Sequence, residues 1–320
     1  MSKQKQSTFK TKVGGQALIE GVMMRGVDKA AMAVLLPDKT IDVESWEITP
    51  SKKRNLFFRL PLVRGVVNLI ESLVLGYKCL MKSAEKSGMA QEEDEEPGRL
   101  EQYLKKKFGD AATTGLFRVT MVIATVLAVV LAVGLFIYLP ALAARSLGSW
   151  LEVGYLQGII EGVIKIVIFV LYLFLVSRMK DMRRMFQFHG AEHKTIACYE
   201  AGEELTPENA KKFKRFHPRC GTSFLLIVLI LGIIVFSVVT WDSLLIRTVL
   251  KVVLIPVVVG LAYEIIRLAG RYDNIVTRIV SAPGLWLQRI TTNEPDEEQL
   301  RVAIAAVKPV LPEDREEGRW

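Results

Sequence analysis

Long uninterrupted runs of apolar residues are the feature that most limits how this chain of 320 residues can fold. A helix needs roughly 20 mostly apolar residues to cross the hydrocarbon core of a bilayer. Four runs meet this requirement, at residues 116–139, 158–176, 223–241 and 249–268. The sequence therefore predicts a mainly α-helical, polytopic membrane protein built around a bundle of four transmembrane helices.

The distribution of basic residues predicts how this bundle is oriented. The segment between the second and third runs is rich in Lys and Arg, whereas the segment between the first and second contains only Arg145. Short cytosolic segments carry the excess of Lys and Arg in membrane proteins. We therefore expect both termini and residues 181–222 to lie in the cytosol, where the three cysteines stay reduced.

The overall charge indicates which partners to expect. A formal net charge of +8 fits attraction to the anionic lipids of the cytosolic leaflet. No basic stripe is interleaved with stacking aromatic residues, so nucleic-acid binding is not expected. The remaining expected partner is a substrate or a protein embedded in the same membrane.

The segments around the apolar runs predict smaller elements. Residues 1–55 read as a β-containing unit, with strands at 31–36 and 40–48 and a glycine-bounded tight turn at 14–26 that lines a site. Residues 56–82 predict an amphipathic helix in the membrane interface, with a fifth transmembrane span as the alternative. The other expected divisions are an acidic linker with a short helix (83–110), transmembrane residues (111–180 and 223–269), a cytosolic His/Cys segment (181–222) and a cytosolic or interfacial C-terminal segment (270–320). Within the C-terminal segment we expect an interfacial element, then a helix that ends at about residue 307, and a frayed end.

All three histidines of the chain fall within residues 181–222. His189, Glu192 and His193 form the pattern H-x-x-E-H, which places both imidazoles on one face of a helix, one turn apart. This is the reverse of the H-E-x-x-H metalloprotease signature, as found in the inverzincins. The pattern predicts two metal ligands, with Glu192 as a general base.

Three further residues are candidates for the next ligand. His217 and Cys220 are spaced three apart, a separation common in zinc sites. Glu264 lies late in the last apolar run, at the same expected depth, and a carboxylate inside an apolar span predicts a functional site. Zinc is the expected ion, and Arg219 or Arg25 is expected to stabilise negative charge on a substrate.

Each candidate ligand also has a structural interpretation. His189 and His193 could be interfacial polar residues on a basic segment, and Cys220 could be a small packing residue at the start of a helix. Glu264 could form an ion pair with Arg267.

Six short motifs resemble the YqhQ-like family of bacterial multi-pass membrane proteins. They are GGQALIEGVMMR (14–25), HGAEHK (189–194), HPRCGTSF (217–224), YEIIR (263–267), PGLWLQ (283–288) and TTNEP (291–295). The resemblance implies a plasma-membrane protein of a bacterium, in a family described as a predicted metal-dependent enzyme. It implies no substrate.

These observations lead to two functional hypotheses. The first is a zinc-dependent hydrolase at the cytosolic membrane surface, acting on a membrane peptide or a lipid-linked molecule. The second is a membrane assembly or scaffold factor in which His189, His193, His217 and Cys220 close a structural metal site. A transporter is disfavoured because no inverted repeat is visible.

Overall fold

The computed structural model describes residues 9–50, 55–88, 123, 126–150, 157–237, 244–272 and 274–319. Two compact units are present, one formed by Met1–Gly88 with Leu173–Trp320 and the other by Met89–Tyr172. The chain is mainly helical with a small N-terminal antiparallel sheet, as the sequence predicted. The expected linker and short helix at 83–110 lie mostly outside the described residues.

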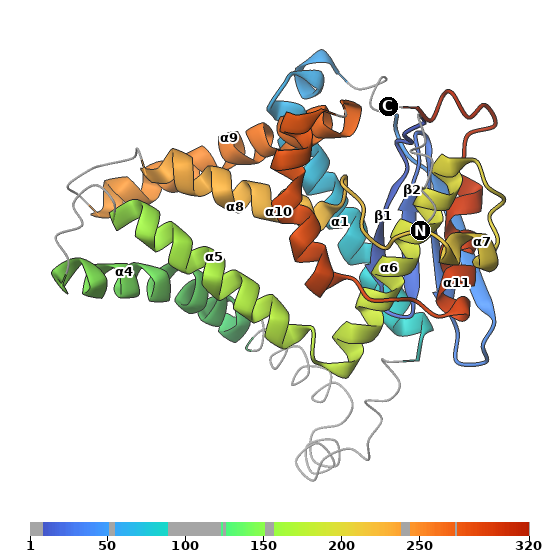
Figure 1. The fold of residues 1–320 in the computed structure, drawn as a ribbon, viewed down its shortest axis with the longest axis horizontal. Coiled ribbons are helices and arrows are strands. Elements are labelled where there is room, and N and C mark those ends of the chain that lie inside the picture. Colours follow the sequence, from blue (N-terminus) through green and yellow to red (C-terminus); the bar gives the residue numbers. More distant parts are fainter. Residues whose placement is uncertain are drawn as a thin grey trace, which may run out of the picture. The chain divides into compact units, whose positions relative to one another are not determined.

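The sheet has four strands in the order β1-β2-β3-β4 (Figure 1). Strands β3 (Lys29–Leu35) and β4 (Ile41–Glu47) confirm the expected pair at 31–36 and 40–48. Residues 14–26, expected to form a single tight turn, instead form β1 (Gly14–Leu18) and β2 (Gly21–Arg25), joined by a two-residue turn. Glu20 in this turn has a φ of 49°, the left-handed conformation that such hairpin turns favour.

Helices cover both faces of the sheet. Helix α1 (Val63–Lys86) packs Cys79 against Leu18, Met23, Met32 and Val34 on one face. On the other face, α6 (Lys180–Ala201) and α11 (Glu297–Val307) share a core with residues of β2 and β3 such as Val22 and Ala33. Because both faces are buried, these strands lack the alternation of apolar and polar residues that marks a half-exposed strand.

Helix α1 confirms the amphipathic helix expected at 56–82, preceded by the short 3-10 helix η2 (Leu56–Arg59). Its first half packs on α9 (Leu244–Arg271), where a Cβ added to Gly65 would lie 2.7 Å from the Tyr263 side chain. Its second half covers the sheet, so α1 joins α9 to the sheet. Its position relative to a membrane remains a prediction.

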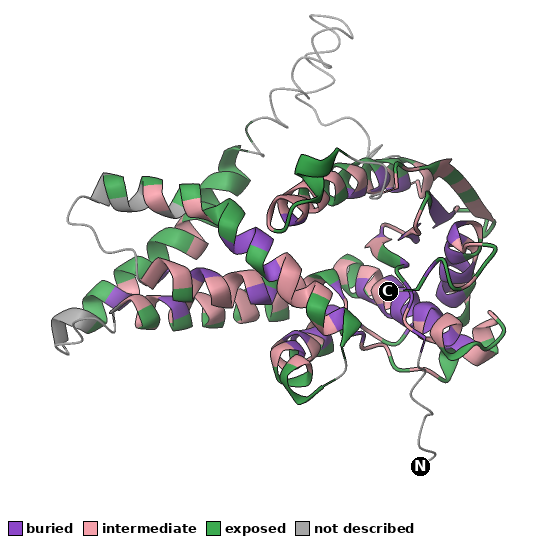
Figure 2. Ribbon diagram, turned by 90° about the horizontal axis from the view of Figure 1, so that it is seen from above, coloured by how far each residue is buried: buried purple, intermediate pink, exposed green. Residues whose placement is uncertain are grey.

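Among the residues that the structure describes, three helices are long and apolar enough to cross a membrane: Val126–Leu147, Gly158–Val176 and Val252–Arg271. In the most apolar 18-residue stretch of each helix, only 6%, 6% and 22% is buried within the protein. Exposed and intermediate colours dominate these helices in Figure 2. Such exposed apolar surface indicates association with a membrane. Helix α8 (Gly221–Ser237) is also apolar but shorter, and residues 238–243 after it are not described.

The membrane-length helices differ in detail from the four expected spans. The first expected run, 116–139, lies partly outside the described residues, and the helix found there extends further, to Leu147. In the smaller unit, η3 (Gly134–Tyr138) continues into α4 (Leu139–Trp150). Phe136 of η3 contacts Tyr172 of α5 (Gln157–Val176), with ring centroids 5.5 Å apart. A bundle of all four apolar helices stays a prediction.

The C-terminal segment is helical and well packed. Helix α10 (Ile275–Thr291) follows α9, contacts α8 and leaves Trp286 69% exposed. The remaining short elements are α7 (Pro207–Lys211), which follows α6, and η5 (Lys308–Val310), which follows α11. Asp296 caps α11, and Pro295 directly precedes this cap. The expected fraying of the end is wrong for the described residues, because Lys12 donates to the Gly318 carbonyl at 2.7 Å and Thr11 forms a β-bridge with Arg319.

Candidate metal centre

Helix α6 carries the H-x-x-E-H residues on the face turned toward the protein interior. His189 and His193 are one turn apart, and their ring centroids lie at 4.4 Å. His193 is 1% exposed, whereas His189 is half-buried. The helix therefore holds the two imidazoles together, as the spacing predicted.

Cys220 completes a group of three metal-binding side chains. It immediately precedes α8, and its Sγ lies 3.1 Å from His189 Nε2. The donor atoms of His189, His193 and Cys220 all lie within 4.8 Å of one another. Two imidazoles and a thiolate are donors that zinc prefers.

Backbone carbonyls orient both imidazoles from outside this group. His189 Nδ1 lies 2.8 Å from the Thr291 carbonyl, and His193 Nδ1 lies 2.6 Å from the Arg215 carbonyl. Nδ1 can be the donor in both contacts, which leaves the Nε2 lone pairs free to bind a metal. His193 Nε2 is in fact a buried nitrogen without a hydrogen-bond partner among the described residues. A metal ion would satisfy this atom.

The charges of the group favour the thiolate form of Cys220. Burial by itself would raise the pKa of Cys220, but His189 and His193 outweigh it and hold the pKa well below the usual range. Burial by itself would lower the pKa of His189, but the nearby Cys220 thiolate raises it to about 9. The thiolate is the form of cysteine that binds metal ions.

Glu192 lies beside the three donors but outside the group that they form. Its side chain is buried, and burial raises its pKa, which the two nearby histidines only partly offset. One carboxylate oxygen, Oε2, has no hydrogen-bond partner among the described residues. A buried carboxylate with a raised pKa and a free oxygen has the properties of a general base.

A glycine of β1 makes room for this carboxylate. A Cβ added to Gly15 would lie 3.0 Å from Glu192 Cδ and 2.6 Å from the Met23 carbonyl oxygen. The backbone N–H of Gly15 also interacts with the Glu192 carboxylate. Gly15, within the segment 14–26 that was expected to line a site, therefore lies against Glu192 as part of a hairpin.

Gln288 of α10 positions the segment that leads to Cys220. Its side-chain oxygen accepts from the His217 backbone N–H at 2.7 Å, and its amide nitrogen donates to the His217 carbonyl at 2.7 Å and to Ser223 Oγ at 3.0 Å. Gln288 is fully buried. It therefore clamps both sides of the segment that contains the thiol.

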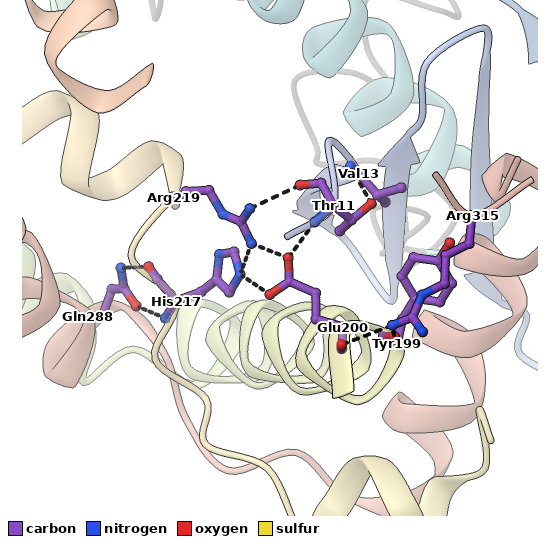
Figure 3. Close-up of polar contacts among 8 residues, drawn as sticks. All are labelled: Thr11, Val13, Tyr199, Glu200, His217, Arg219, Gln288 and Arg315. Carbon is purple, nitrogen blue, oxygen red and sulfur yellow. Dashed lines mark hydrogen bonds and ion pairs between the residues drawn. The ribbon is translucent and has the colours of Figure 1, made fainter. Parts of the chain in front are cut away.

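His217 does not join the three donors. Its Nε2 lies 3.1 Å from Arg219 Nη2 and 3.7 Å from Glu200 Oε2 (Figure 3). Burial lowers the pKa of His217 to about 4, so the ring is neutral. The candidate ligand His217 is therefore held in a neighbouring network instead.

Arg219 belongs to the same network. Its guanidinium pairs with Glu200 and donates to the Thr11 carbonyl at 3.1 Å, and its side chain is 8% exposed. Figure 3 shows this group between the N-terminal segment and the end of α6. These protein acceptors replace the substrate anion that the sequence suggested for Arg219.

Two other candidates also have protein partners. The Glu264 carboxylate accepts from Arg64 at 2.6 Å, with a second hydrogen bond from the same guanidinium, and lies 3.8 Å from Arg267. This is the structural ion pair that was the alternative interpretation, with Arg64 as an additional partner. Arg25 pairs with Glu71 of α1 at 3.2 Å.

Sequence reasoning missed several residues that support the site. Glu200 follows His193 by two helical turns on α6, a spacing that could have identified it. Gln288 and Thr291 lie in two of the motifs that carry the family resemblance, but no property of an isolated Gln or Thr predicts a contact with a distant histidine.

Comparisons with known proteins identify the family. A family model described as "Protein of unknown function (DUF1385)" matches residues 60–313. The chain is 34% identical over 299 residues to the uncharacterized protein YqhQ of Bacillus subtilis strain 168, covering 93% of this chain and 92% of that protein. The chain therefore belongs to this YqhQ-like family, as its motifs predicted. No solved structure matches it.

Proposed function

We propose that this protein is a metal-dependent hydrolase that works at the cytosolic face of the bacterial plasma membrane, with zinc as its ion. The observation that carries the proposal is the convergence of His189, His193 and Cys220, whose donor atoms lie within 4.8 Å of one another. Three protein donors leave a tetrahedral ion one open position, which is the arrangement of catalytic rather than structural zinc sites.

The residues present fit such an ion. His193 Nε2 is buried and has no hydrogen-bond partner in the described part of the chain, and both histidines are oriented through Nδ1 by carbonyls. A bound zinc supplies a Lewis acid that acidifies water and polarises a carbonyl group.

Glu192 is the proposed general base. It takes a proton from the attacking water at its free Oε2 and later returns it to the leaving group, so that one water is consumed for each bond broken. Gly15 leaves room for this carboxylate, because a Cβ at that position would lie 3.0 Å from Glu192 Cδ.

The proposed location rests on the apolar helices and the basic residues. Cys220 immediately precedes the apolar helix α8, so one donor stands at the end of a helix that is apolar throughout. The segment with the three histidines is rich in Lys and Arg, which favours the cytosolic side. The proposed substrate is therefore a molecule held at the membrane, either a peptide or a lipid-linked compound.

A structural metal site in an assembly factor is the second candidate. The burial of His193 and Cys220 favours it, because structural zinc sites are closed to water. In that case Glu192 would have no proton to transfer, and changing it would alter neither the metal content nor the membrane composition of the cell.

The test combines metal analysis with a search for accumulated substrate. Wild-type protein purified in detergent should contain about one zinc per chain by plasma mass spectrometry, and His193→Ala should lose it. Glu192→Gln should keep the zinc, and cells that carry this variant should accumulate a membrane peptide or lipid that wild-type cells turn over.

Two results would overturn the proposal. Wild-type protein without metal after gentle purification would exclude the metal-dependent mechanism. A Glu192→Gln variant that retains zinc and leaves the membrane peptides and lipids identical to wild type would favour the structural site.

A further inference from the structure

Strand β1 stands at the edge of the sheet. Within the described residues it pairs on one side only, with β2, in the register that joins Gly15 to Met24 and Ala17 to Val22. A strand edge offers a row of N–H and C=O groups that can pair with another extended chain.

The orientation of this edge follows from the register of the hairpin. Leu18 and Gly21 flank the two-residue turn as a hydrogen-bonded pair, so Gly15, which is three positions before Leu18, directs its N–H and C=O away from β2. Glu192 lies at this point, because a Cβ added to Gly15 would be 3.0 Å from its Cδ. Backbone groups alternate in direction along an antiparallel strand, so the N–H and C=O of Ala17 are directed away from β2 as well. The outer edge of β1 therefore begins at the proposed general base.

The same edge is open where it meets Glu192. Gly14 and Gly15 are exposed, and a Cβ added to Gly14 would have no neighbour within 4 Å among the described residues. Two consecutive glycines leave this part of the edge without side chains that would keep another backbone away.

We infer that the substrate of the proposed hydrolase is a polypeptide in extended conformation that pairs with the outer edge of β1. This inference rests on the function proposed above and narrows its substrate class. Neighbouring strands lie about 4.8 Å apart, so a paired peptide runs directly beside the carboxylate that starts the reaction. A lipid-linked compound without a peptide backbone offers no matching row of donors and acceptors.

The pairing also predicts a register. Ala17 lies two residues from Gly15, about 6.6 Å along the strand. Its N–H and C=O therefore bind a substrate residue about two positions from the bond that is cleaved. This contact is made through the backbone and accepts many side chains.

Hydroxamate ligands test the inference on zinc-loaded wild-type protein. Acetohydroxamate reports on the metal alone, and a library of capped tetrapeptide hydroxamates reports on the metal together with the strand edge. The tightest peptide hydroxamate should bind at least about tenfold more tightly than acetohydroxamate. Methylation of its backbone nitrogen that faces Ala17 should weaken binding by about tenfold, the effect of losing a hydrogen bond and crowding the pairing.

A matched pair of variants provides the protein side of the test. Ala17→Pro removes the outward N–H while leaving the β2 side of the strand intact, a place where edge strands tolerate proline. It should weaken the peptide hydroxamate but not acetohydroxamate, with zinc content unchanged. Val43→Pro, the same change on the exposed strand β4 at the opposite end of the sheet order, should leave both affinities unchanged.

The outcomes separate this inference from the proposed function. If neither hydroxamate binds and no zinc is present, the proposed function fails. If acetohydroxamate binds but the peptides add no affinity, or the methylated peptide binds as well as its parent, the hydrolase stands and the strand-pairing inference is overturned. Because methylation changes the ligand only, this conclusion does not depend on whether Ala17→Pro folds.

Discussion

Gln288→Ala tests whether the metal centre depends on a residue that does not touch it. The substitution removes the acceptor for the His217 N–H and the donor to the His217 carbonyl, and both groups lie on a residue that is 7% exposed. Each buried group left unpaired costs about 1–3 kcal/mol, so the variant should lose about 2–6 kcal/mol of stability. Because His217 leads directly to Cys220, the thiol should also lose its place, and zinc affinity should fall by about 10–100-fold.

The assay needs a control that separates position from stability. Gln299 is an equally buried glutamine that caps α11, where its oxygen accepts from the Asp296 N–H at 2.9 Å. Gln299→Ala should lower the thermal midpoint followed by Trp fluorescence while leaving zinc affinity, measured by competition with a chromogenic chelator, unchanged. Equal zinc affinities for Gln288→Ala and wild type, at a matched loss of stability, would refute the reasoning.

Three further predictions address the candidate ligands, the buried network and the orientation. Glu264→Gln should retain zinc because its carboxylate is held by Arg64; zinc loss in this variant by plasma mass spectrometry would make Glu264 a ligand. Burial would raise the pKa of Glu200, but His217 and the charge of Arg219 lower it to about 2. The pairing of the Glu200 carboxylate therefore stabilises the fold at pH values above 4.5, the ordinary pKa of this group, and this stabilisation is lost as the pH falls from 4.5 toward 2. In chelator-treated protein, the Glu200→Gln variant should therefore have a lower melting temperature than wild type at pH 7 and the same melting temperature in acid. A difference in melting temperature that stays constant with pH would contradict this. A reporter that works only in the cytosol should be active when it is fused after residue 320, because the basic segments favour a cytosolic terminus. Activity of a phosphatase that works only in the periplasm, fused at the same place, would reverse the predicted orientation.

Local patterns in the sequence were sufficient where the structure depends on near neighbours. The apolar runs predicted the helices because hydropathy over about 20 residues is a property of the segment itself. The spacing of His189 and His193 predicted their common face because a helix has 3.6 residues per turn. The hairpin of β1 and β2 was missed because helices cover both faces of the sheet, which removes the alternation that identifies strands.

The choice among the candidate donors depended on the tertiary structure. Cys220, His217 and Glu264 were equally plausible from spacing and expected depth. Arg219 and Glu200 surround His217, and Arg64, 200 residues away in the chain, pairs with Glu264. Sequence spacing identifies groups that can bind a metal, but the free energy of a buried polar group depends on which partners the rest of the fold brings to it. Only the fold leaves Cys220 beside the two histidines, with the edge of β1 next to Glu192.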